Sequence, residues 1–369
     1  MAAPLKDRFD VELVCRLAAL LGAGVPGFDE HDFVAAATSD FADLELSQRA
    51  RAVAAALPAQ LPPDPATAID LIRTSLPDSV AAQRWQSFDS FMLWPLTMYV
   101  AEHGQSCFEE SMAAQHALTQ LFTAEFSIRS FLQQQPQRTL AQLADWTTDP
   151  SEHVRRLVSE GTRPRLPWAA QLPAFIADPS PILPLLEPLR DDPSEYVRRS
   201  VANNLNDIAK DHPDVARAVT ARWLAEDPSR RPLVRHALRT LVKAGDPAAL
   251  RILGYDGRSP IGVTRMTIQP TSPRIGDRLT VVLELSNPSP SPAAARVDLV
   301  VGFARPSGNP RRKVFVGAEL ELPPGERRTL RRSVSLAQLS TRAVHPGTHT
   351  VAIMINGVEG PPSQVQVAS

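Results

Sequence analysis

The chain has 369 residues, of which 43% are hydrophobic, so it is long enough for two packed domains, and a mainly disordered protein is excluded. Residues 1–10 mix charged with apolar side chains, from which we expect no signal peptide and no membrane anchor, but a soluble, cytoplasmic protein. The net charge of −1 favours no particular partner, and two cysteines too far apart in sequence for a zinc site predict buried free thiols, with no metal and no cofactor.

Up to about residue 254 the sequence predicts an all-α domain. Apolar residues recur at intervals of three and four, for example over residues 46–57, 91–101 and 110–122. Proline clusters such as the one at residues 61–65 mark helix ends. We expect four tryptophans to lie in the core of this part: Trp85, Trp94, Trp146 and Trp223.

An internal repeat begins after Trp146. The sequence Asp-Pro-Ser-Glu-His-Val-Arg-Arg at residues 149–156 recurs at 192–199 with Tyr in place of His, and a looser copy starts at Asp227. In each copy we expect the Asp to cap a helix, the Val to lie in the core and the following Arg to lie near a groove. Such a repeat is typical of HEAT-like proteins, which stack into a solenoid (an α-α superhelix) whose concave surface is the natural place for function.

After residue 260 the apolar period changes to two, which predicts β-strands. Alternating apolar residues are found at 279–285, 297–301, 320–322 and 351–355, with turns at 287–288 and 323–326 and a hairpin signal at Asn356-Gly357. We therefore predict two domains, an all-α HEAT-like repeat domain at residues 1–256 and an all-β immunoglobulin-like sandwich at residues 261–369, the latter without a cysteine pair.

The charge is unevenly divided between these two parts. Residues 261–369 hold 13 Lys and Arg and 7 Asp and Glu, which gives this part a charge of +6 and leaves the preceding part at −7. A basic module commonly binds an anionic partner, and a solvated charged face is an equal alternative. The basic residues gather at a predicted loop tip, Arg311-Arg312-Lys313, and in a second cluster within residues 327–332.

Four segments of the helical part, taken together, resemble the AlkC family, a bacterial branch of the HEAT-like alkylpurine DNA glycosylases related to AlkD. They are residues 122–131, 146–156, 159–168 and 201–207. The run Ser-Glu-Gly-Thr-Arg-Pro-Arg-Leu-Pro-Trp at 159–168 is quite specific, whereas an Asp-Pro-Ser repeat alone is not. The order of helical repeats followed by a sandwich also matches the longer AlkC members.

The resemblance implies a base-excision-repair enzyme that hydrolyses the N-glycosidic bond of cationic alkylated bases, with 3-methyladenine and 3-methylcytosine as the expected lesions. A base that already carries a positive charge is a good leaving group, so no general acid has to protonate it. The protein then has to stabilise the sugar cation and orient a water molecule, and carboxylates can do both. The expected partner is alkylated duplex DNA, bound by a monomer at the nucleoid.

By the same resemblance, the catalytic candidates are Glu160 and Asp207, with Glu125 as a third. Aligning the first two repeats places Glu160 opposite Asn203, and Asp207 lies one turn beyond Asn203 on the same helix face, so both carboxylates can face the groove. We prefer Asp207 as the residue that positions the attacking water. The alternative is that Glu160 and Asp207 form surface ion pairs with basic neighbours on their own helices.

The resemblance also gives candidates for contact with DNA. Trp168 is the candidate for lesion binding, because an aromatic face attracts a cation and so distinguishes a charged base from neutral ones. Guanidinium groups suit phosphate on a concave surface, and a basic tip of the sandwich can reach a groove or the backbone. The predicted DNA-binding residues are Arg156, Arg163, Arg199, Arg311, Arg312 and Lys313.

Two alternative functions remain open: a non-catalytic HEAT-repeat scaffold that binds other proteins, and a DNA-damage-binding protein. The scaffold leaves the run at residues 159–168 unexplained, and the matching site residues give no sign of lost catalysis. Other enzyme classes gain no support, because the sequence has no phosphate-binding Gly-Lys-Ser/Thr loop, no dinucleotide glycine fingerprint, no nucleophile elbow and no His-Glu-x-x-His helix.

Overall fold

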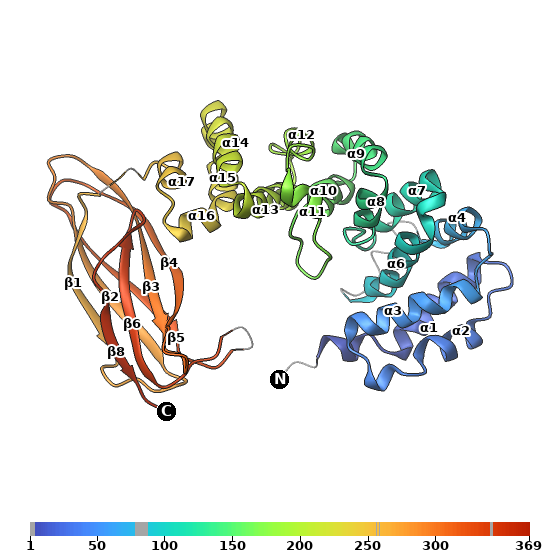
Figure 1. Ribbon diagram of the computed structural model, residues 1–369, viewed down its shortest axis with the longest axis horizontal. Coiled ribbons are helices and arrows are strands. Elements are labelled where there is room, and N and C mark those ends of the chain that lie inside the picture. Colours follow the sequence, from blue (N-terminus) through green and yellow to red (C-terminus); the bar gives the residue numbers. More distant parts are fainter. Residues whose placement is uncertain (1–3, 78–87, 256, 258, 340–341) are drawn as a thin grey trace. The chain divides into compact units, whose positions relative to one another are not determined.

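The computed structural model describes the chain except for residues 1–3, 78–87, 256, 258 and 340–341, so Trp85 lies outside the described residues (Figure 1). The chain forms two compact units, Met1–Asp211 and His212–Ser369. The change from helices to strands near residue 260 falls inside the second unit. The predicted domain division at residues 256–261 stays a prediction.

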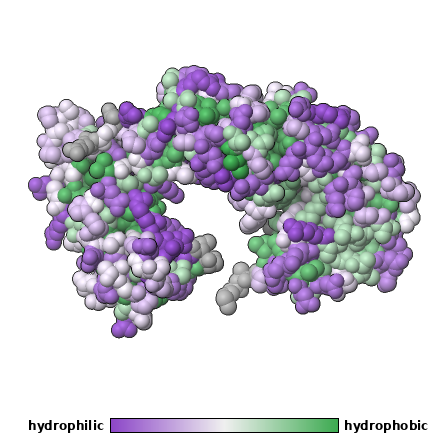
Figure 2. Space-filling model, viewed as in Figure 1, coloured by the Kyte–Doolittle hydropathy of each residue, from purple (hydrophilic) through white to green (hydrophobic). Residues whose placement is uncertain are grey.

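The first unit is built from helices, as the sequence predicts. Its α-helices are α1 (Val11–Gly24), α2 (Glu30–Thr38), α3 (Leu46–Ala56), α4 (Pro65–Ser75), α6 (Trp94–His103), α7 (Phe108–Thr119), α8 (Ile128–Gln134), α9 (Pro136–Asp145), α10 (Glu152–Gly161), α11 (Pro173–Ala177), α12 (Leu183–Leu186) and α13 (Glu195–Asp211). Helix α1 packs against α2, α4 against α7, α8 against α9 and α10 against α13 (Figure 1). Hydrophilic residues are spread over the visible surface of these helices (Figure 2). Among the described residues, no helix combines the length and the apolar character needed to cross a membrane.

Helices α10 and α13 hold the two closest copies of the sequence repeat. The repeated valines, Val154 and Val197, are both 0% exposed, which confirms their predicted place in the core. Leu157 on α10 and Val201 on α13 are buried with them. Burial of each such side chain contributes about 1.5–3 kcal/mol to folding, so the repeated apolar positions stabilise both helices.

The prediction that Asp caps the helix was wrong for these two copies. Helices α10 and α13 each begin three residues after the repeated Asp. The carboxylates of Asp149 and Asp192 instead accept hydrogen bonds from the backbone N–H of the serine two residues later, at 2.8 and 2.9 Å, and so form a tight turn ahead of the helix. Asp192 also accepts two hydrogen bonds from Arg155, at 2.6 and 3.0 Å, which ties one repeat to the next.

The second unit combines helices with two antiparallel sheets. Its helices are α14 (Pro213–Glu226), α15 (Arg231–Ala237), α16 (Arg239–Ala244) and α17 (Pro247–Ile252). Its strands are β1 (Gly262–Gln269), β2 (Arg278–Ser286), β3 (Ala293–Phe303), β4 (Arg311–Leu322), β5 (Arg327–Ser335), β6 (Gly347–Ile355), β7 (Val358–Glu359) and β8 (Ser363–Val367). Strands β1, β2 and β5 form one sheet, and β4, β3 and β6 form the other, with β7 and β8 both paired to β6. The predicted sandwich is confirmed.

The sandwich core lies between the two sheets. On β2 the alternating residues Leu279 and Leu283 are 1% and 2% exposed, as the period of two predicts. Strand β3 departs from this pattern, because its outward-facing Val300 is buried as well. Val300 packs with Ala352 and Met354 of β6 in a second, smaller apolar cluster. Strand β3 is therefore covered on both faces.

The predicted hairpin turn joins β6 to β7. Asn356 and Gly357 have φ angles of 46° and 82°, as a type I′ turn requires. The Asn356 side-chain oxygen accepts a hydrogen bond of 2.8 Å from the backbone N–H of Arg296 on β3. A Cβ at Gly357 would lie 2.8 Å from the carbonyl oxygen of Gly245, next to α16. The turn is thus fixed both to the sandwich and to the helices of its own unit.

The two cysteines have different surroundings. Cys107 is buried, and burial raises the pKa of its thiol. Cys15 is exposed, so its predicted burial was wrong. It lies on the outer side of α1, whose apolar residues Leu13, Leu17 and Leu21 face the core instead.

Candidate active site

Two carboxylates from neighbouring helices are brought together by one arginine. Glu160 lies on α10, Asp207 lies on α13, and Arg163 follows α10 by two residues. Arg163 Nη1 donates a hydrogen bond of 2.6 Å to Glu160 Oε1, and its Nε donates one of 2.8 Å to Asp207 Oδ2. Because α10 and α13 pack against each other, the stacking of the repeats itself brings the two acids within reach of one side chain.

A second arginine joins the third carboxylate to this pair. Glu125 lies in the turn before α8 and forms an ion pair with Arg156 of α10. Arg156 Nη2 also lies 3.5 Å from Glu160 Oε1. The result is a continuous series of alternating charges, called the carboxylate row below, which consists of Glu125, Arg156, Glu160, Arg163 and Asp207.

The three acids differ in how many of their oxygens are already bonded. Both oxygens of Glu160 and both oxygens of Asp207 accept hydrogen bonds from side chains, including one of 2.6 Å from Ser200 to Glu160 and one of 2.7 Å from Lys210 to Asp207. Glu125 takes its side-chain contacts on Oε2. Its Oε1 has no hydrogen-bond partner among the described residues, so Glu125 has an oxygen available for a ligand.

The carboxylate row is buried rather than at the surface. Glu125, Glu160 and Asp207 have 9%, 6% and 1% of their surface exposed. The ion pairs that the alternative interpretation expected within α10 and within α13 do form, but their carboxylates are buried, and of the two basic partners only Lys210 is exposed. Burial by itself would lower the pKa of Arg163, yet the charges and hydrogen bonds of Glu160 and Asp207 outweigh this effect and raise it. The site is an electrostatically coupled unit.

The three arginines predicted to contact phosphate in the helical part have different surroundings. Arg163 is 7% exposed and faces the two acids of the row, so its guanidinium is not placed for phosphate in this structure. Arg156 is likewise directed to Glu125 and is largely buried. Arg199 is well exposed and pairs with Glu195 one turn away, at 3.0 Å. Of the three, Arg199 has the surroundings that a phosphate contact needs.

Trp168 projects from the loop that joins α10 to α11. It is 95% exposed, and its φ of 65° lies in the left-handed region that residues other than glycine rarely adopt. Such a backbone costs about 1–3 kcal/mol and is commonly found at functional sites. Packing does not account for this side chain, because almost none of its surface is covered. Its presentation fits contact with a ligand.

Tyr196 belongs to the same region and was missed in the sequence. Its ring lies 5.2 Å from the guanidinium carbon of Arg156 and 5.9 Å from the ring of His153, which holds the equivalent position in the first repeat. It is 45% exposed, so it adds an accessible aromatic surface beside the carboxylate row. The available signal was the change from His to Tyr in an otherwise repeated octapeptide.

Comparison with known proteins shows to which family the chain belongs. A family model described as the C-terminal Ig-like domain of the uncharacterised protein YhaZ matches residues 262–369, and a HEAT repeat model matches residues 182–212. The uncharacterized protein YhaZ of Bacillus subtilis (strain 168) is 36% identical over 356 residues, which are 96% of this chain and 97% of that protein. The Pseudomonas fluorescens alkylpurine DNA glycosylase AlkC, solved bound to DNA containing an abasic site analog, is 35% identical with a TM-score of 0.91, and the match covers 100% of both chains. The chain belongs to the AlkC family. The resemblance inferred from four sequence segments is therefore confirmed.

In this member of the AlkC family, the basic residues predicted at a loop tip of the sandwich are the beginning of strand β4. The backbone of this segment pairs with β3: Arg311 lies opposite Phe303, Arg312 opposite Gly302 and Lys313 opposite Val301. Strand pairing, not a loop, therefore fixes the position of these residues. Arg312 forms an ion pair of 2.8 Å with Glu359 of β7. The segment remains at the surface, which leaves its predicted contact with DNA open.

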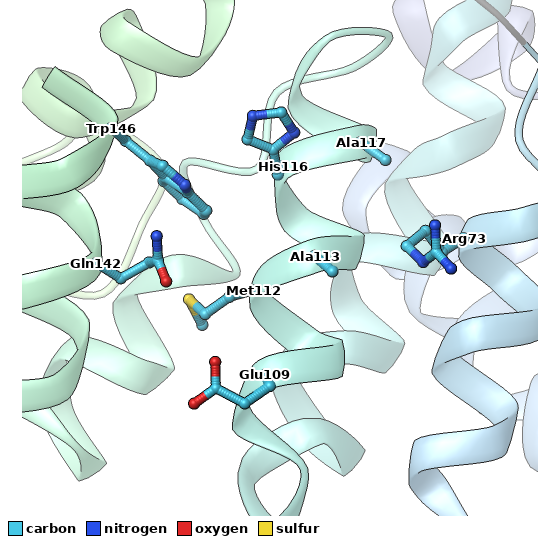
Figure 3. A pocket seen from close by; sticks show the side chains of 8 residues that line it. All are labelled: Arg73, Glu109, Met112, Ala113, His116, Ala117, Gln142 and Trp146. Atoms are coloured by element: carbon cyan, nitrogen blue, oxygen red, sulfur yellow. The ribbon is translucent and has the colours of Figure 1, made fainter. Parts of the chain in front are cut away.

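The helical unit also has a cavity of about 420 Å³ (Figure 3). None of the residues that line it belongs to the carboxylate row. Figure 3 shows α7 at its centre, with Gln142 and Trp146 on one side and Arg73 on the other. His116 of this cavity is bonded to Asp149 at 2.7 Å. No predicted site residue lines the cavity, and the buried Trp146 confirms its expected place in the core.

Proposed function

We propose that this chain is a DNA repair glycosylase that hydrolyses the N-glycosidic bond of cationic alkylated bases in duplex DNA, with 3-methyladenine and 3-methylcytosine as substrates. The observation that carries the proposal is the carboxylate row, in which three buried acids are held together by two arginines. Full-length similarity to an alkylpurine DNA glycosylase supports the same class of reaction. The chain would act as a cytoplasmic monomer on the nucleoid.

The chemistry needs negative charge more than it needs a proton donor. A cationic base leaves without protonation, and the sugar develops positive charge as the bond breaks. Fixed carboxylates in a site of low dielectric stabilise such a charge without having to reorganise. A carboxylate oxygen that is not already bonded can also accept a hydrogen bond from the attacking water.

Within the row, the acids suit two different roles. Glu125 retains an oxygen without a partner among the described residues, so we assign it the orientation of water at the sugar. Asp207, which the sequence favoured for this role, is 1% exposed and both of its oxygens are bonded. In our proposal Asp207 and Glu160 contribute the negative charge that stabilises the sugar cation and fix Arg163 between them.

In this proposal, Trp168 recognises the lesion. A cation over an indole face gains about 0.5–2 kcal/mol, which a neutral base does not receive. The side chain is 95% exposed, so its faces are accessible to a base in the duplex. The proposal does not require a deep pocket for a flipped base.

Binding of the duplex requires cations at the surface. Each phosphate neutralised by Lys or Arg adds to affinity through release of counterions. Arg199 on α13 is the exposed candidate in the helical unit. In the sandwich, the candidates are Arg311, Arg312 and Lys313 at the start of β4.

The test is release of free 3-methyladenine and 3-methylcytosine from methylated duplex DNA by the wild type and by Glu125→Gln, Glu160→Gln and Asp207→Asn. We expect each variant to lose about 10²- to 10³-fold in the rate of the chemical step while DNA binding is kept. The matched control is Asp298→Asn, which alters a carboxylate that is 2% exposed and paired with Arg296 in the sandwich, outside the row.

The alternatives predict different outcomes of the same experiment. A non-catalytic scaffold would release no base and would show no preference for methylated DNA. A DNA-damage-binding protein would prefer methylated DNA but release no base. Equal losses in Asp298→Asn and in the row variants would show that the effect is one of folding and would remove the support for a catalytic row.

A further inference from the structure

A buried arginine outside the carboxylate row holds the segment that presents Trp168. Arg129 lies on α8 and is 3% exposed. Its Nη1 donates hydrogen bonds to the carbonyl oxygens of Gly161 at 3.0 Å and Arg163 at 2.7 Å. Its Nε and Nη2 both donate to the carbonyl oxygen of Ala170, at 3.0 and 2.6 Å. One guanidinium therefore binds backbone on both sides of Trp168.

The segment between α10 and α11, residues 162–172, is called the Trp168 loop. Its two ends are also joined by a backbone hydrogen bond of 3.1 Å from Leu172 to Pro164. Arg165 of the loop forms two hydrogen bonds of 2.7 Å with Asp211 at the end of α13. Arg129 thus closes the base of a loop whose exposed tip carries Trp168 in a strained backbone conformation.

We propose that Arg129 is a positioning residue for the reaction, which sets the Trp168 loop and, through the backbone of Arg163, the carboxylate row. This inference rests on the proposed function. Arg163 is held at its carbonyl by Arg129 and at its side chain by Glu160 and Asp207. Arg129 therefore links the residue that meets the base to the residues that act on the sugar.

The need to fill space in the core does not explain why a charged side chain such as Arg129 lies at this buried position. The hydrogen-bond partners of Arg129 among the described residues are backbone carbonyls, and burial, together with the charge of Arg163, lowers the pKa of Arg129 to about 10. It still carries its charge at neutral pH, and burial of a charge is costly. What the guanidinium supplies is a rigid planar fork whose three nitrogens reach three carbonyls at once. Glutamine has a single donor nitrogen, and lysine carries all its donors on one nitrogen, so neither reproduces this geometry.

The experiment compares Arg129→Gln and Arg129→Lys with the matched control Arg49→Gln. Arg49 of α3 is also buried, at 9% exposed, and also donates to three backbone carbonyls, those of Lys6, Phe9 and Leu44. Loss of a buried arginine that binds backbone is therefore common to both sites. Of these two arginines, only Arg129 binds the Trp168 loop.

The first measurement does not depend on catalysis. The protein is labelled with 5-fluorotryptophan, and the ¹⁹F resonance of Trp168 is assigned by its loss in Trp168→Phe. We expect this resonance to split or broaden in both Arg129 variants and to stay a single line in Arg49→Gln. Other tryptophan resonances should stay in place, which separates a loosened loop from a loosened fold.

The second measurement is base release together with affinity for undamaged duplex DNA. We expect kcat/KM for cationic lesions to fall roughly 10- to 100-fold in both Arg129 variants, while affinity for undamaged DNA is kept. An unchanged Trp168 resonance, or wild-type base release, in a folded Arg129→Gln would overturn the proposal. If Arg129→Gln does not fold, Arg129→Lys decides by the same two criteria, because it keeps the buried charge. Failure of the proposed function has a separate signature, namely no base release by the wild type.

Discussion

Replacement of Arg163 tests whether the carboxylate row is held by buried electrostatics. Arg163→Gln removes a guanidinium that bonds Glu160 at 2.6 Å and Asp207 at 2.8 Å, where these acids are 6% and 1% exposed. Removal of one partner from a buried ion pair costs about 3–5 kcal/mol. Because Ser200 and Lys210 continue to bond one oxygen of each acid, we expect the lower end of this range, about 3 kcal/mol.

The assay is urea unfolding followed by far-ultraviolet circular dichroism, which reports chiefly on the helices. With a slope of about 3 kcal/mol/M, the midpoint should fall by about 1 M. The double variant Arg163→Gln/Asp207→Asn should recover about 1–2 kcal/mol, because the second change removes one of the unpaired charges. A midpoint within about 0.2 M of the wild type, with no coupling between Arg163 and Asp207, would refute the reasoning, since it would mean that water already solvates these acids.

Four further substitutions test other parts of the structure. Leu205→Ala on α13, at a position 0% exposed, should cost about 2–5 kcal/mol in the same urea assay, and a loss below about 1 kcal/mol would mean that the helices close over the space left by the side chain. Trp168→Gly should leave the melting temperature unchanged or raise it, because glycine adopts a φ of 65° without strain, while lesion release falls; a lower melting temperature would contradict an exposed indole. Gly357→Ala should destabilise the second unit by about 1–3 kcal/mol, because the φ of 82° and the carbonyl 2.8 Å from a Cβ both oppose a side chain, and thermal unfolding of the variant measures this. Arg199→Ala should reduce the slope of log affinity against log salt concentration by about 1, and an unchanged slope would exclude a phosphate contact at this residue.

The sequence predicted those elements whose pattern is set by burial on one face. The valines at equivalent positions of α10 and α13 and the alternating residues of β2 are examples, and both patterns are confirmed. In the sequence, strand β5 shows a cluster of basic residues, because its arginines hide the alternation of Leu330 and Val334. Strand β1 gave no signal, because most of its side chains are exposed or only partly buried. Such strands are specified by pairing with β2, which is a property of two segments and not of one.

The site was predictable as a set of residues but not as an arrangement. Three arginines were assigned one role, contact with phosphate, because the sequence gives their type and their place on a helix. In the structure the three arginines differ in the acidic partner that lies next to each of them. Arg156 meets Glu125 from the turn before α8, Arg163 meets Asp207, 44 residues further along the chain, and Arg199 stays exposed beside Glu195 of its own helix.

The same reasoning changes which acid is expected to orient the water. In the sequence, the resemblance to the AlkC family singles out Glu160 and Asp207, and alignment of the repeats places Asp207 on the face that should meet the groove. In the structure, these two acids are the ones most fully bonded by their neighbours, because the stacked repeats supply partners on both sides. Glu125 lies in a turn at the edge of the row and keeps an oxygen without a partner among the described residues. A motif identifies the acids of such a site, but their bonding decides which of them can still take a substrate or a water.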